Sequence, residues 1–257
     1  MEVKAANQKG VSTTTLGLGL DYNEDLLEAM ARAGDGSYYY VESPVQLTDL
    51  FQTELQGLMA TLGRSVRLAV EPAEGVILSD ILNDLPRLPG GELTLPNLVV
   101  GMPILVYLRF SVPARSEAGP LCLLRLSWES PENGHRRELS MPYIAPEVMP
   151  IEWWAALPED AKVVEQEALL MSARAQKEAA AAAERGDFAG SRAFLANARD
   201  YVALAPMSSQ IEEELRSLAR TIEAFESGEH IRMMKRAKSR SYQRGYSRPN
   251  PPEPPNS

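Results

Sequence analysis

The chain has 257 residues, of which 44% are hydrophobic and 24% charged, and its formal net charge is −9. These values are typical of a soluble globular protein with one large domain or two to three smaller ones, and the acidic balance argues against a whole-chain nucleic-acid binder. The single cysteine, Cys122, excludes an internal disulfide, and no stretch approaches the roughly 20 apolar residues of a membrane helix.

Residues 1–63 show a strand–helix–strand–helix pattern. A β-branched apolar run at 11–18 favours a strand, and Asn23 is a suitable cap for a helix at 24–33. The tyrosine-rich run 37–42 favours a second strand, and Pro44 opens a further helix. This order predicts a parallel strand pair with helices packed against it.

Residues 64–148 change to a period of two. The run 65–71 alternates apolar and polar side chains, and further strands are expected at 76–82, 92–98, 103–112, 121–129 and 136–144. Asn133 and Gly134, between the last two runs, favour a tight hairpin. Six short strands at this spacing predict an antiparallel β-sandwich.

Residues 149–227 are predicted to be helical. The segment 159–185 is rich in helix-forming Ala, Glu and Gln, and Gly186-Asp187 then interrupts it, with Asp187 as the cap of the next helix. Ser208 or Ser209 caps a third helix. The two helices joined by Gly-Asp-Phe predict a helical hairpin of the tetratricopeptide type, present as a single unit.

Residues 228–257 form a basic segment. Seven Lys/Arg against two acids give it a net charge of +5, which leaves −14 on the other residues. Because it is polar from Ser239 onward and rich in proline at its end, disorder is expected. The whole chain is therefore expected to be a mixed α+β protein with a disordered tail.

The segments GVSTTTLGLGLDYNEDLLEAMA (10–31) and GDGSYYYVESP (34–44) resemble the last third of bacterial von Willebrand factor A (VWA) domains, most nearly the chloride-channel-like branch. The resemblance implies that residues 1–63 are the C-terminal part of a VWA-like α/β domain. The β-rich and helical zones also resemble the regions C-terminal to VWA domains in such proteins.

One departure from that family matters for function. VWA domains bind a divalent metal through an Asp-x-Ser-x-Ser motif, and the chain contains no such motif. No metal site and no cofactor are therefore expected. The resemblance also implies that the strand at 11–18 has an unpaired edge, for which three explanations are open. The gene start lies upstream, another chain supplies the missing half, or a second copy pairs with the edge.

The expected function is protein recognition or scaffolding without catalysis, in the cytoplasm because residues 1–10 carry no apolar signal core. The candidate partner-binding residues are Thr13 and Thr15 on the edge strand, Trp153 and Trp154 after the β-rich zone, and Phe188, Phe194 and Tyr201 on the helical hairpin. A simpler interpretation of the tryptophan pair is that it joins the β-rich zone to the helices.

Two alternatives remain open. The first is a nucleic-acid or anionic-surface binder that uses Arg232, Lys235, Arg236, Lys238, Arg240 and Arg244. A solubilising tail, or one that folds back on the acidic body, is the favoured interpretation of these residues. The second is a metal-dependent VWA adhesion module, if upstream residues supply the motif. Catalysis is not expected, although Cys122 and His135 lie on paired strands and could approach each other.

Overall fold

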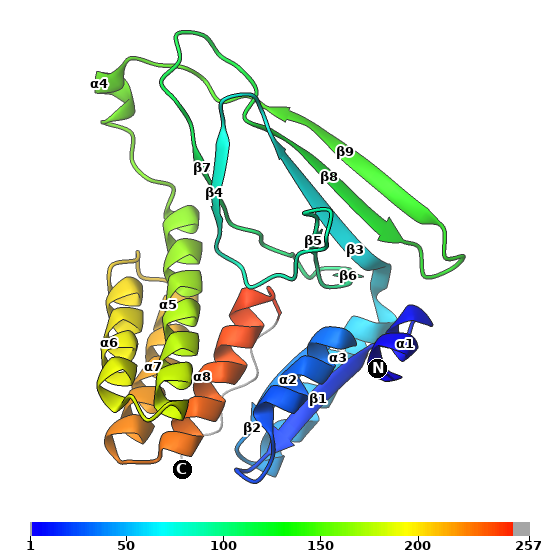
Figure 1. Cartoon of the computed structure of the whole chain (residues 1–257), viewed down its shortest axis with the longest axis vertical. Coiled ribbons are helices and arrows are strands. Elements are labelled where there is room, and N and C mark those ends of the chain that lie inside the picture. The colour runs from blue at the N-terminus through cyan, green and yellow to red at the C-terminus, as the bar shows by residue number, and fades with distance from the viewer. Residues whose placement is uncertain (1, 249–257) are drawn as a thin grey trace.

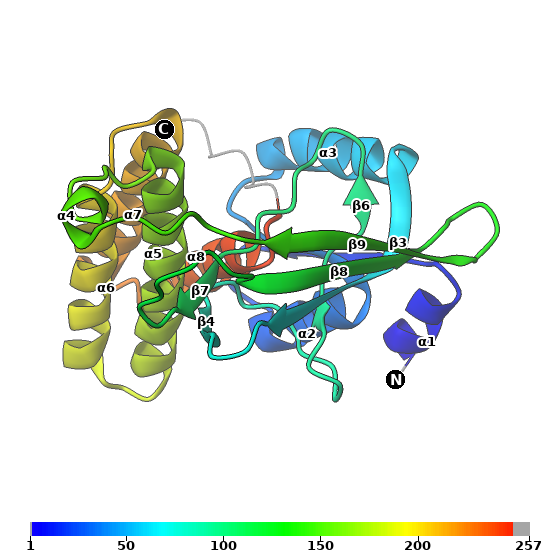
Figure 2. The same cartoon turned by 90° about the horizontal axis from the view of Figure 1, so that it is seen from above.

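The computed structural model describes residues 2–248, which form three parts around one C-terminal helix (Figure 1). An N-terminal α/β unit lies opposite a bundle of long helices, and an antiparallel β-rich part lies above the α/β unit and reaches toward the bundle. Helix α8 (His230–Gly245) runs between the bundle and the α/β unit, as both views show (Figures 1 and 2).

The N-terminal α/β unit confirms the predicted alternation of strands and helices. Its elements are α1 (Glu2–Gln8), β1 (Thr13–Leu18), α2 (Glu24–Ala33), β2 (Asp35–Val41), the 3-10 helix η1 (Pro44–Gln46) and α3 (Leu47–Met59). Strands β1 and β2 pair in parallel. Because side chains alternate along a strand, Tyr38 packs with Ala31 of α2 on one face, while Tyr39 packs with Leu50 of α3 on the other. The two helices therefore cover opposite faces of the strand pair.

The antiparallel part has strands within each predicted run, divided over two sheets. The run predicted at 92–98 forms two separate short strands, the run at 103–112 becomes a strand only from Leu108, and the β-sandwich stays a prediction. The strands are β3 (Thr61–Pro72), β4 (Ile77–Ile81), β5 (Leu93–Thr94), β6 (Leu98–Val99), β7 (Leu108–Ser111), β8 (Cys122–Glu129) and β9 (Arg136–Ile144). One sheet has the order β5-β3-β8-β9, with β6 also paired to β3, and β4 pairs separately with β7. The Asn-Gly hairpin is confirmed, since Gly134 between β8 and β9 has a φ of +68° that favours glycine.

The helical bundle confirms the predicted hairpin. After the short α4 (Ile151–Trp154), its helices are α5 (Ala161–Glu184), α6 (Phe188–Ala203) and α7 (Ser209–Glu226). Asp187 and Ser208 cap α6 and α7 through their side chains, as expected. Alanines such as Ala179, Ala180 and Ala198 are fully buried, so their small side chains let the helix backbones approach closely.

Helix α8 corrects the prediction of a disordered tail at 228–257. Residues 230–245 form a regular helix whose Met233, Ala237 and Tyr242 are buried, and residues 249–257 lie outside the described residues. The helix is stable here because acidic side chains of the other parts neutralise its cations. The fold-back that the charge balance favoured is therefore what the structure has.

Helix α8 also closes one edge of the parallel strand pair. Its side chains bond to the backbone of β2: Ser239 accepts from Tyr40 N (3.1 Å), Tyr242 donates to Gly36 O (2.7 Å), and Gln243 donates to Tyr38 O. These three β2 residues are even-numbered, so they share the edge that faces away from β1. Three polar backbone groups of that edge are therefore bonded to helix side chains, where a further strand would otherwise bond them.

Candidate interaction surfaces

The outer edge of β1 is the open edge of the strand pair. Within residues 2–248, β1 pairs with β2 alone. The amides of Thr13 and Gly19 donate toward the β2 side, to Gly34 O and Val41 O. Because successive backbone groups alternate in direction, the N–H and C=O groups of Thr14, Leu16 and Leu18 point away from β2. These groups form a row along which another strand can pair.

The two predicted edge residues, Thr13 and Thr15, do not face the outer edge of β1. The amide of Thr13 is bonded to Gly34. The side chain of Thr15 is buried and donates to Leu27 O at 2.9 Å. Neither residue therefore offers its polar groups to a partner. Which residues of a strand face outward depends on the pairing register, so the sequence alone could not indicate that Thr14, Leu16 and Leu18 hold the outer positions. A partner at this strand stays a prediction.

Helix α3, which covers one face of the strand pair, carries two exposed apolar side chains. Glu54 points at the sheet and accepts hydrogen bonds from side chains of β1 and β2. Thr53 lines a hollow together with Thr14 of β1 and with Arg248. Successive helix residues are rotated by about 100°, so Phe51 and Leu55 project from the side of α3 opposite to Thr53. They are 53% and 58% exposed.

The other long edge strand, β9, differs from β1 in its charged residues and its proline. It carries Arg136, Arg137 and Glu138 and also contains Pro142, which has no backbone N–H. Charged residues and proline are the devices by which proteins prevent edge strands from pairing. Strand β1, with the sequence TTTLGL, has neither. The β1 edge is therefore the unprotected one.

The tryptophan pair of α4 lies at the surface. Trp153 is 71% exposed and Trp154 is 67% exposed, and neither ring belongs to a hydrophobic cluster of residues 2–248. The interpretation that both rings join the β-rich zone to the helices is therefore wrong.

The three aromatic residues predicted on the helical hairpin do not form one surface. Phe188, 45% exposed at the start of α6, stacks on His230 with 4.4 Å between ring centroids. Phe194 packs against the bundle core. Tyr201 lies near the far end of α6, about 20 Å along the helix from Phe188. The structure therefore does not bring them together.

Each of the six basic residues predicted to bind an anionic partner is paired with a carboxylate. Lys235 lies 2.6 Å from Glu24, and Lys238 lies 2.6 Å from Asp25. The remaining pairs are Arg232 with Glu229, Arg236 with Glu42, Arg240 with Glu213 and Glu214, and Arg244 with Glu214. Each of these cations therefore already has an acidic neighbour in the fold, and binding of an anionic partner stays a prediction.

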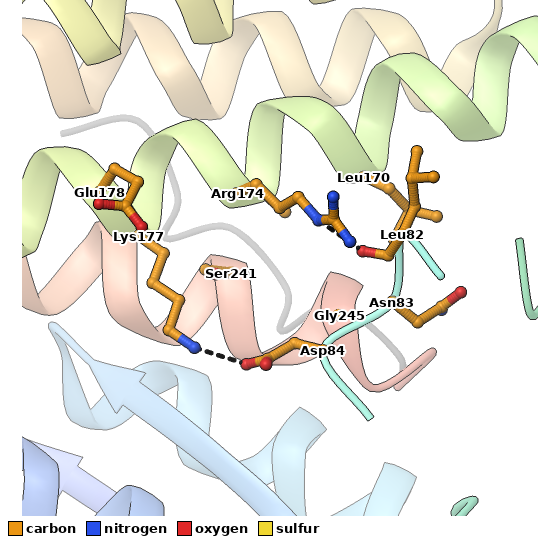
Figure 3. Close-up of a pocket in the computed structure, with 10 residues that line it drawn as sticks. Leu82, Asn83, Asp84, Leu170, Arg174, Lys177, Glu178, Ser241 and Gly245 are labelled. Carbon is orange, nitrogen blue, oxygen red and sulfur yellow. Dashed lines mark hydrogen bonds and ion pairs between the residues drawn. The ribbon is translucent and has the colours of Figure 1, made fainter. Parts of the chain in front are cut away.

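A polar cleft of about 390 Å³ lies between α5, α8 and the loop at 82–84 (Figure 3). Asp84 is 2.7 Å from Lys177 of α5 and 2.7 Å from Arg32 of α2. Burial raises the pKa of Asp84, but the hydrogen bond from Lys177 and the charge of Arg32 outweigh it and hold that pKa below its ordinary value. Arg174 donates to Leu82 O at 2.9 Å. The charges of the cleft thus join the three parts of the chain.

Cys122 and His135 do not approach each other. In the β8–β9 register Cys122 is opposite Ile144, whereas His135 follows the hairpin turn at the other end. Burial also raises the pKa of the Cys122 thiol, which disfavours the thiolate. Among residues 2–248, no group of three or more His, Cys, Asp or Glu side chains is arranged to hold a metal ion.

Comparison with known proteins places this arrangement in the class of VWA-like folds. Similar solved structures include a von Willebrand factor type A protein from Catenulispora acidiphila (TM-score 0.57, 16% identity, 84% of this chain and 53% of that one) and the human COPII-coat protein Sec24c (TM-score 0.56, 15% identity, 93% of this chain and 32% of that one). This chain thus spans about half of the first and a third of the second. No protein-family model and no curated protein matches it. Within the described part, none of the helices has the length and apolar content needed to cross a membrane.

Proposed function

We propose that this chain is a non-catalytic protein–protein interaction module of the VWA type, which binds an extended segment of another polypeptide along the outer edge of β1. Addition of a strand to an open sheet edge is a common mode of peptide recognition, in which main-chain hydrogen bonds supply affinity and side-chain contacts supply specificity. A protein of the COPII coat shares the fold, which supports a role in assembly.

The observation that carries the proposal is the asymmetry of the strand pair. The β2 edge is closed by side chains of α8, including Tyr242 and Gln243. The β1 edge has no such cover within residues 2–248. The side chains of Leu18 on β1 and of Phe51 and Leu55 on α3 are exposed. A strand bound there would satisfy the backbone row of β1 and bury the side chain of Leu18.

The proposal excludes metal-dependent adhesion as the mode of binding for this chain's own residues. The sequence contains no Asp-x-Ser-x-Ser motif. The binding energy is instead expected from backbone pairing and apolar contact.

A library of random twelve-residue peptides displayed on phage tests the proposal when it is selected against the wild-type chain. The informative variant is Leu18→Pro, which removes an N–H from the outer edge and leaves the bonds between β1 and β2 in place. The matched control is Leu26→Ser, which removes a leucine of similar exposure (57% against 52%) on α2.

Selected peptides should alternate β-branched or aromatic residues, as strands do, and should bind Leu18→Pro at least tenfold more weakly than Leu26→Ser. Sedimentation of the chain without peptide tests whether two copies pair with each other. If the wild type is a dimer and the Leu18→Pro variant is a monomer, a second copy of the chain is the partner. Peptides that bind both variants equally, in the absence of such a dimer, would refute the proposal.

A further inference from the structure

The connection between β9 and α5 is a second exposed apolar feature, separate from the β1 edge. Every residue from 145 to 160 is exposed except Met149. Its helix α4 lies at one end of the molecule, away from both the sheet and the α/β unit (Figure 1). The most exposed apolar side chains are Ile151 (73%), Trp153 (71%) and Trp154 (67%). Large aromatic side chains rarely remain this exposed without a role in binding.

The apolar residues of this segment have helical spacing. Ile151, Trp154 and Leu157 follow one another at intervals of three, so they share one face of a helix. Pro150 precedes the helix and Pro158 follows Leu157, which limits a regular helix to residues 151–157. The segment is therefore a two-turn amphipathic motif between two prolines, of which the first turn, α4, is already helical.

The charged residues of the segment itself are all acidic. Residues 145–160 contain Glu147, Glu152, Glu159 and Asp160 and no Lys, Arg or His. Tryptophan suits a membrane interface, but four acids repel the anionic lipids that attract such segments. A protein surface with basic residues around an apolar groove is complementary to the segment in charge and in apolar character.

We propose that residues 145–160 are a docking segment, whose Ile151, Trp154 and Leu157, with Trp153 at the margin of the same face, insert into an apolar groove of a partner protein rimmed by Lys and Arg side chains. Tryptophan residues contribute most of the binding energy in such interfaces, and the surrounding acids guide association and fix orientation. This inference does not depend on the strand-pairing proposal, since the two surfaces share no residue.

The test uses the full chain and a library of three-helix-bundle scaffold proteins whose groove positions are randomised. Binders are selected on the wild-type chain and measured against three variants. Trp153→Ala with Trp154→Ala removes the anchors and leaves the charge unchanged. Glu152→Lys with Glu159→Lys reverses the charge and leaves the anchors. Leu204→Ser with Met207→Ser removes equally exposed apolar groups from the α6–α7 connection (84% and 68%) and serves as the control.

The expected binders carry apolar grooves enriched in Lys and Arg. They should lose at least tenfold in affinity for each of the first two variants, lose affinity as salt is raised from 50 to 500 mM, and bind the control like the wild type. Binders without basic enrichment, or with equal affinity for the tryptophan variant, would overturn the proposal. So would tryptophan-dependent sedimentation with vesicles of phosphatidylcholine or phosphatidylserine, which would assign the segment to a membrane surface.

Discussion

The phenolic hydroxyl of Tyr242 in α8 donates a hydrogen bond of 2.7 Å to the carbonyl oxygen of Gly36 in β2, across 206 residues of sequence. In a larger parallel sheet that carbonyl would accept from a neighbouring strand. Here a helix side chain takes that place, and the basic C-terminal segment becomes part of the α/β unit rather than an appendage. The strand pair is thereby left with one closed edge and one open edge.

The substitution Tyr242→Phe is expected to destabilise the chain by about 1–3 kcal/mol, because it leaves the buried carbonyl of Gly36 without a donor. The measurement is urea unfolding followed by circular dichroism. Tyr201→Phe is the control, since Tyr201 is 37% exposed on α6 and its change should be close to zero. Equal midpoints for the two variants would show that the β2 edge does not depend on α8.

The ion pair of Lys235 and Glu24 is expected to be the most sensitive contact of α8. Lys235 Nζ is buried, 2.6 Å from Glu24 and 2.8 Å from Tyr22 O. Lys235→Ala leaves Glu24 with the more distant Lys238, at 3.9 Å, and should cost about 3 kcal/mol, the lower end of the range for a broken buried pair. The double variant Lys235→Met with Glu24→Gln should recover part of this loss. Arg216→Ala, which breaks an exposed pair with Glu212, should cost less than about 1 kcal/mol. A loss at Lys235 no greater than at Arg216 would mean that α8 is not held by this pair.

Asp35 makes a specific pH dependence testable. Burial raises the pKa of its carboxyl to about 6, and Arg248 at 2.8 Å offsets only part of that effect. The folded state therefore holds the proton more tightly than the unfolded state, whose aspartate pKa is about 3.9. The contribution of Asp35 to stability is present below about pH 4 and is lost as the pH rises through about 6.

The variant Asp35→Asn isolates this effect, since asparagine tolerates the φ of +50° at this position. The quantity to follow is the unfolding free energy of Asp35→Asn minus that of the wild type. This difference should rise by up to about 3 kcal/mol between pH 3.5 and pH 7. A difference that stays constant with pH would contradict the assignment.

Two glycines give opposite expectations for the same substitution. A Cβ on Gly63 of β3 would lie 2.5 Å from Trp128 Cδ1, so Gly63→Ala should destabilise the chain by about 1–3 kcal/mol. A Cβ on Gly57 of α3 would meet nothing within 4 Å, so Gly57→Ala should stabilise it by about 0.5–1 kcal/mol. Thermal unfolding of both variants checks the pair, and a stabilising Gly63→Ala would show that β3 and β8 do not pack as described.

Local signals in the sequence were sufficient to predict most of the helices and strands. Asn23, Asp187 and Ser208 are confirmed as helix caps, and Asn133-Gly134 as a hairpin turn, because each acts within a few residues of itself. The parallel pairing of β1 with β2 followed from the order of the elements.

No local signal of this kind predicted the role of α8. Its buried face includes polar residues such as Ser239, Arg240 and Gln243, whose partners come from β2 and α7. A helix of this kind has no continuous apolar stripe, so a periodicity argument misses it. The only signal was the balance of +5 in the tail against −14 elsewhere, which favours folding back but does not indicate where.

Residue-resolved amide hydrogen exchange of β1 tests the central claim most directly. In the free chain the amides of Thr14, Leu16 and Leu18 are expected to exchange fast and that of Gly19, bonded to Val41 O, slowly; addition of a strand-forming peptide should then slow the first three. Slow exchange of Thr14, Leu16 and Leu18 in the free monomer would show that the edge is already paired, and would contradict the account.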